Sequence, residues 1–134
     1  MEKRVIQLQM LSWPDHCVPE AETGYNTLEY LLSAVSECKA NYANSPVLVH
    51  CSAGTGRTGT FIAIHNIIKG LQMIKYINQS VDQFHKIKPF FSVFNLVRKL
   101  REQRMFMITS QMQYGYIYDF SLEWIRRNFE PLEN

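Results

Sequence analysis

The feature that most constrains this chain is residues 50–59, which read His-Cys-Ser-Ala-Gly-Thr-Gly-Arg-Thr-Gly. A short apolar run precedes the stretch at 46–49, and an apolar run of helical character follows it at 60–64. This order predicts a strand, a tight loop and a helix. The inward-turned backbone N–H groups of such a loop, together with the partial positive charge of a helix N-terminus, suit an anion. The stretch therefore predicts a phosphate-binding loop.

Two side chains give this loop its chemistry. A thiol at Cys51, surrounded by so many N–H donors, is expected to ionise below the pKa of about 8.5 of a free cysteine, within the roughly 3.5–7.5 range of activated cysteines. The guanidinium of Arg57 can hold two phosphate oxygens at once. A buried structural cysteine beside a glycine-rich turn is the alternative, and the glycine spacing and Thr58 disfavour it. A Walker A nucleotide site is excluded because no Gly-Lys-Ser/Thr follows.

A second loop, residues 13–19, is bounded by prolines and reads Trp-Pro-Asp-His-Cys-Val-Pro. Taken alone, it is most simply a surface turn anchored by a tryptophan. The Cys51 site favours another interpretation, because phosphoryl transfer from a phenol needs an acid for the leaving oxygen. A carboxyl group on a mobile loop can supply that proton, a contribution of typically 10²–10⁴-fold in rate.

Three motifs together resemble the cysteine-based protein tyrosine phosphatases. Residues 50–61, HCSAGTGRTGTF, are similar to the family signature, and residues 13–19 resemble its mobile general-acid loop. Residues 104–114 resemble the glutamine loop of the phosphotyrosine-specific branch, which argues against the dual-specificity branch. The run at 92–104 is also similar to short members from insect-parasitoid polydnaviruses.

The resemblance implies a metal-free and cofactor-free hydrolysis of phosphotyrosine through a cysteinyl-phosphate intermediate. It implies Cys51 as nucleophile, Asp15 as general acid and base, and Gln113 as an aid to water and phosphate. Thr58 would donate to the leaving thiolate. The implied phosphate-binding residues also include Ser52, Ala53, Gly54, Thr55, Gly56 and Arg57, and the implied supporting residues are His50, Trp13 and Pro14.

Two departures from the family pattern leave a second hypothesis open. Cys17 stands where the family usually has glycine, and Thr109 stands where it usually has the first, water-positioning glutamine. An active phosphatase is the first hypothesis. A phosphotyrosine-binding pseudophosphatase or decoy with little turnover is the second, and a fragment that folds only with a partner is the third.

The expected fold is α/β, with 134 residues forming a single truncated domain. It corresponds to the C-terminal half of the phosphatase fold, a mostly parallel sheet with flanking helices. The N-terminal strands and helices are expected to be missing, and a partner is expected to cover the face they leave. Strands are predicted at 4–11 and 46–50. Helices are predicted from 23 or 26 to 43 and over 57–75, 81–88, 93–103 and 111–127. In the helix over 57–75 the expected core residues are Phe61, Ile64, Ile67, Ile68 and Leu71.

Composition limits the classes of binding partner and the cellular compartment that we expect for this chain. The net charge of +2 is too small to indicate nucleic acid or a membrane surface, although it suits a phosphorylated protein substrate. The three cysteines lack the spacing of a disulfide framework, which predicts a reducing, cytoplasmic location. No apolar stretch is long enough for membrane insertion, and no cluster has metal-ligand spacing. The basic run at 98–104 is interpreted as the solvated face of its helix, with a docking patch as the alternative.

Overall fold

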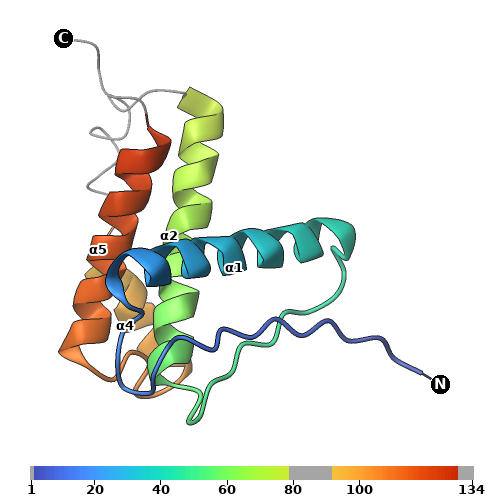
Figure 1. Ribbon diagram of the computed structural model, residues 1–134, viewed down its shortest axis with the longest axis horizontal. Helices are drawn as coiled ribbons and strands as arrows, with labels where there is room; N and C mark the ends of the chain where they lie inside the picture. The colour runs from blue at the N-terminus through green and yellow to red at the C-terminus, as the bar shows by residue number, and fades with distance from the viewer. Residues whose placement is uncertain (1, 79–91, 130–134) are drawn as a thin grey trace. The chain divides into compact units, whose positions relative to one another are not determined.

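The computed structural model describes residues 2–78 and 92–129, and the ordered elements in these ranges are all helices (Figure 1). They are α1 (Ala21–Asn41), α2 (Gly56–Asn78), α4 (Val93–Gln103) and α5 (Gln111–Asn128). No strand occurs in these two ranges. The expected α/β fold with a central sheet is therefore wrong for the part of the chain that the structure describes.

The two segments predicted as strands show why the described part of the chain has no sheet. Residues 4–11 and 46–50 have no regular secondary structure. Most of their apolar side chains face solvent, with Val5 83% exposed and Leu48 88% exposed. Alternating apolar residues suit the surface of a sheet, but the N–H and C=O groups of a strand must pair with a neighbouring strand. Among the residues described, neither segment has such a neighbour, so sequence pattern alone does not produce a sheet.

The chain divides into two compact parts, and the first, residues 2–14 with 18–48, contains α1. The helix begins at Ala21, earlier than predicted, and its N-cap residue Glu20 makes no side-chain capping hydrogen bond. Its first turn carries Glu22 and its last turn Lys39, which is the favourable order for the helix dipole. The buried positions recur at helical spacing, as expected for an amphipathic helix: Tyr25, Leu28, Leu32 and Val35.

The second part comprises residues 15–17, 49–78 and 92–129 and is organised around α2. Both α4 and α5 pack against α2. Figure 1 shows α2 (green to yellow) and α5 (orange to red) side by side, with their N-termini at the same end. The predicted apolar face of α2 is confirmed, since all five of its named residues are buried. Burying one such aliphatic or aromatic side chain stabilises a fold by about 1.5–3 kcal/mol.

Two serines start the other helices of this part. The hydroxyl of Ser92 accepts from the backbone N–H of Asn95 at 3.2 Å, and that of Ser110 accepts from Gln113 at 3.1 Å. Such caps satisfy N–H groups that the helix itself leaves free. The predicted bounds of α4 and α5 are confirmed to within one residue. The helix predicted over 81–88 lies outside the described residues. Over the ranges 2–78 and 92–129, no helix has the length and apolarity to span a membrane.

Candidate active site

The predicted phosphate loop runs from a segment without regular secondary structure into the first turn of α2, which begins at Gly56. Two of its glycines are required by geometry. Gly54 has φ of 71°, a left-handed conformation that residues with a Cβ rarely adopt. A Cβ added to Gly56 would lie 2.7 Å from Thr109 Oγ1 and 3.2 Å from Gln113 Nε2. The glycines thus permit both the turn and the close approach of the loop after α4.

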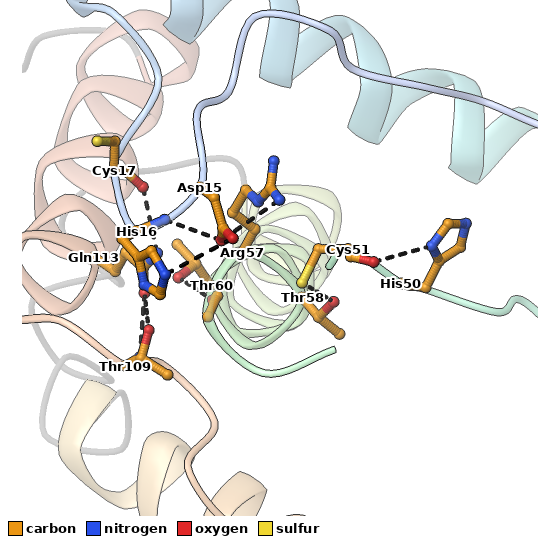
Figure 2. Close-up of polar contacts among 11 residues, drawn as sticks. Asp15, His16, Cys17, His50, Cys51, Arg57, Thr58, Thr60, Thr109 and Gln113 are labelled. Carbon is orange, nitrogen blue, oxygen red and sulfur yellow. Dashed lines mark hydrogen bonds and ion pairs between the residues drawn. The ribbon is translucent and has the colours of Figure 1, made fainter. Parts of the chain in front are cut away.

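Cys51 lies inside this turn and is held by hydrogen bonds. The Thr58 hydroxyl donates to its Sγ at 3.1 Å (Figure 2). Partial burial raises the pKa of the thiol, but the Thr58 hydroxyl and the backbone N–H groups of Thr58, Gly54 and Thr55 lower it, to about 7 from an ordinary 9.0. Near neutral pH about half of the sulfur is therefore a thiolate. An ionised sulfur surrounded by N–H and O–H donors is the arrangement a nucleophilic cysteine needs.

Arg57 and Asp15 meet next to this cysteine loop. The Nη2 of Arg57 lies 3.4 Å from Asp15 Oδ1, and the two side chains are 24% and 46% exposed. Figure 2 shows the carboxylate of Asp15 directed toward the guanidinium. The same Oδ1 accepts the backbone N–H of His16 at 3.0 Å, and His16 has φ of 61°. The structure therefore brings a carboxyl group from the loop at 13–19 to the arginine of the phosphate loop.

Gln113 ties the acid loop to α5. Its side chain is fully buried. Its Nε2 donates to the Cys17 carbonyl at 3.3 Å, while its Oε1 accepts the N–H of Thr109 at 3.1 Å and the Thr109 hydroxyl at 3.2 Å. Both positions that depart from the family pattern are thus partners of the same glutamine. Both the nitrogen and the oxygen of the Gln113 side-chain amide are thus hydrogen-bonded to protein groups.

The remaining predicted residues lie around this centre. Ser52 and Ala53 are exposed, and Thr55 is half-buried. His50 is exposed, and its Nδ1 lies 3.4 Å from the carbonyl oxygen of Cys51. This contact is with the backbone of Cys51 and not with its thiol. Trp13 and Pro14 belong to the part of the chain that contains α1, where the tryptophan is buried and the proline is exposed.

Two arginines of the basic run also contact this site, and the sequence interpretation missed them. Arg104 donates from Nε to the carbonyl of Gly54 at 3.0 Å and from Nη2 to that of Ala53 at 3.3 Å. Arg101 donates to the carbonyls of Met107 and Ile108 at 3.0 and 2.9 Å. Both residues are exposed, as a solvated face predicts, but their guanidinium groups also bond backbone carbonyls. Their spacing of three places them on one side of a helix, but spacing does not tell which neighbour that side meets.

Metal-binding groups do not gather here: within the described residues, no three His, Cys, Asp or Glu side chains are placed to hold an ion.

Comparison with known proteins identifies relatives of this chain. Residues 1–123 match the family model described as protein-tyrosine phosphatase. Receptor-type tyrosine-protein phosphatase V of Rattus norvegicus is 36% identical over 124 residues, covering 92% of this chain and 6% of that protein. Receptor-type tyrosine-protein phosphatase C of Homo sapiens is 36% identical over 122 residues, covering 91% of this chain and 8% of that protein. Tyrosine-protein phosphatase 2 of Dictyostelium discoideum is 33% identical over 116 residues, covering 87% of this chain and 27% of that protein.

The chain thus spans less than a tenth of the length of the two receptor-type relatives. The match nevertheless includes the acid loop, the cysteine loop and the glutamine loop within residues 1–123. The chain belongs to the protein-tyrosine phosphatase family.

Proposed function

We propose that the protein hydrolyses phosphotyrosine in protein substrates through a cysteinyl-phosphate intermediate. The observation that carries this proposal is the thiol of Cys51, which accepts the Thr58 hydroxyl at 3.1 Å and has a pKa lowered to about 7. A thiolate available at neutral pH is the nucleophile that the reaction requires. Family membership supports the same chemistry.

In the first step, the Cys51 sulfur attacks phosphorus, so that a P–S bond forms and the bond to the tyrosyl oxygen breaks. Asp15 delivers its proton to that oxygen, which leaves as a neutral phenol. Arg57 and the loop N–H groups hold the other phosphate oxygens, the electrostatic stabilisation on which phosphoryl transfer mostly depends. The phosphate competes with the Asp15 side chain for Arg57, since Arg57 Nη2 lies 3.4 Å from Asp15 Oδ1 in the free protein.

In the second step, water attacks phosphorus and gives its proton to the Asp15 carboxylate. The P–O bond to water forms, the P–S bond breaks, and inorganic phosphate is released. Cys51 leaves as a thiolate, which the Thr58 hydroxyl stabilises through the same hydrogen bond. The cycle restores both the thiolate and the protonated carboxyl group.

One observation favours a second candidate, a phosphotyrosine-binding protein with little turnover. The amide of Gln113 is buried and bonded to Cys17 and Thr109, so it is not free to direct water in this conformation. Thr109 stands at the position of the other glutamine and is shorter. A complete first step followed by a slow second step would trap phosphate on Cys51.

The test is phosphate release from a phosphotyrosyl peptide and from the same peptide with phosphoserine, with Cys51→Ser as the blank. Many turnovers on the tyrosyl peptide alone support a tyrosine phosphatase. One equivalent of peptide product without further phosphate supports the binding protein. No reaction above the blank, from protein that unfolds cooperatively, contradicts the enzymatic proposal.

The setting of this activity is also a proposal. Six exposed apolar side chains support a partner that covers the first part of the chain: Val5, Ile6, Leu8, Leu11, Val47 and Leu48. The three cysteines are free thiols, which supports a cytoplasmic location. The run at 92–104 supports a relation to the short polydnavirus members. The small net charge supports a phosphoprotein rather than nucleic acid as the partner.

A further inference from the structure

We propose that Arg104 is a positioning residue that orients two peptide groups of the phosphate loop and so directs the N–H groups of Gly54 and Thr55 at Cys51 and at bound phosphate. This role rests on the proposed function in one respect, namely that the loop holds a phosphate group. It adds a residue from α4's C-terminal end to a site otherwise built from α2, α5 and the two loops.

The inference begins with the two carbonyls that Arg104 holds. Its Nε lies 3.0 Å from the Gly54 oxygen, and its Nη2 lies 3.3 Å from the Ala53 oxygen. A trans peptide group is planar, and its C=O and N–H point in opposite directions. The carbonyl of Ala53 shares a plane with the N–H of Gly54, and the carbonyl of Gly54 shares one with the N–H of Thr55. Holding both oxygens on the Arg104 side therefore turns both N–H groups to the other side.

These two N–H groups are among the hydrogen-bond donors to Cys51. The backbone N–H groups of Gly54 and Thr55 both donate to Cys51. Ser52 and Ala53 are exposed, and Gly54 adopts a left-handed conformation that a glycine can easily leave. A planar guanidinium with two parallel donors restrains such a pair of carbonyls better than a single ammonium group does.

A neighbouring contact extends the same restraint by one residue. The N–H of Ile108 donates to the Thr55 carbonyl at 3.1 Å, and Arg101 holds the carbonyls of Met107 and Ile108. Three consecutive loop carbonyls, at positions 53, 54 and 55, are thus bonded to α4 or to the segment that follows it. Arg104 makes two of these three bonds and makes them directly.

The experiment compares Arg104→Ala and Arg104→Lys with the wild type, and Arg98→Ala serves as the control. Arg98 is an exposed arginine of the same helix that forms an ion pair with Glu102 at 3.6 Å. The first readout is the pH midpoint of Cys51 alkylation by iodoacetamide, followed on the Cys51 peptide by mass spectrometry. The second is the affinity for inorganic tungstate, a tetrahedral oxyanion.

We expect Arg104→Ala to raise the alkylation midpoint from about 7 toward the free-cysteine value of about 8.5 and to weaken tungstate binding about tenfold. Arg104→Lys should fall between the alanine variant and the wild type, and Arg98→Ala should match the wild type. Added guanidinium chloride at low millimolar concentration should lower the midpoint of the alanine variant.

A wild-type midpoint and tungstate affinity in both Arg104 variants would overturn the proposal. So would equal losses in Arg98→Ala and Arg104→Ala, which would indicate a general effect of charge. If Arg104→Ala fails to fold, Arg104→Lys still tests the proposal. A merely structural role of Arg104 predicts that Cys51 in the folded fraction of Arg104→Lys is alkylated with the wild-type pH midpoint. Neither readout needs turnover, so a wild type that binds tungstate without releasing phosphate would contradict the proposed enzyme and leave this inference standing.

Discussion

Replacing Thr58 by valine should raise the pKa of Cys51 by about one unit. The change removes the hydroxyl that donates to Sγ at 3.1 Å and keeps nearly the same volume at a buried position. A hydrogen bond to a charged group contributes about 1.5–3 kcal/mol, and one pKa unit corresponds to about 1.36 kcal/mol. The bond alone therefore accounts for about one to two units.

The lower end of that range fits the site better. The pKa of about 7 is the net of burial, which raises it, and of one hydroxyl and three backbone donors, which lower it. The three backbone donors remain in the valine variant. Because the lost bond stabilises the thiolate, its removal favours the thiol, and the pKa should become about 8. At pH 6.5 the thiolate fraction then falls about eightfold.

The assay is the pH profile of Cys51 alkylation, read from the midpoint because the intrinsic reactivity of a thiolate rises with its pKa. Thr58→Ser is the matched control, since serine keeps the hydroxyl and should keep a midpoint near that of the wild type. A valine variant whose midpoint equals that of the serine variant would refute the reasoning and would assign the lowered pKa to the backbone N–H groups.

Two further predictions concern the buried Gln113 and the half-buried His65. Gln113→Leu should lower the free energy of unfolding in urea by about 1–3 kcal/mol, because it removes the bonds to Cys17 and Thr109 from a fully buried position. Thr109→Ala removes only the bond from a hydroxyl and should lower the free energy of unfolding by less. Equal losses in the two variants would count against a role of Gln113 in holding the acid loop. Burial and then the nearby Lys69 lower the pKa of His65 below its ordinary 6.5. The unfolded chain then takes up the proton first, so the stability that the neutral imidazole contributes is fully present above pH 6.5 and is lost as pH falls through the folded pKa. In His65→Leu the urea midpoint should change less between pH 7.5 and 5.5 than it does in the wild type. Parallel pH profiles of the two urea midpoints would exclude His65 as the cause of the pH dependence.

The motifs predicted more of the site than of the fold. Cys51, Thr58 and Arg57 lie within seven positions of one another, so a turn and the first turn of a helix suffice to bring them together. Helical spacing of apolar residues likewise predicted the buried side of α2. The roles of Arg101 and Arg104 could not be predicted in this way, because a basic run on an amphipathic helix is compatible with solvent, with a ligand or with a neighbouring loop.

The sequence by itself determined which side chains meet in the cysteine loop and the positions of most helices, because both depend on interactions between residues a few positions apart. Only the tertiary structure decided that Arg104 holds the loop carbonyls across 50 positions and that Gln113 holds the acid loop across 96. The same reason explains why the predicted sheet is not found among residues 2–78 and 92–129. A helix satisfies its backbone hydrogen bonds within its own segment, whereas a strand needs a second segment beside it, and the alternation of apolar residues at 4–11 does not supply one.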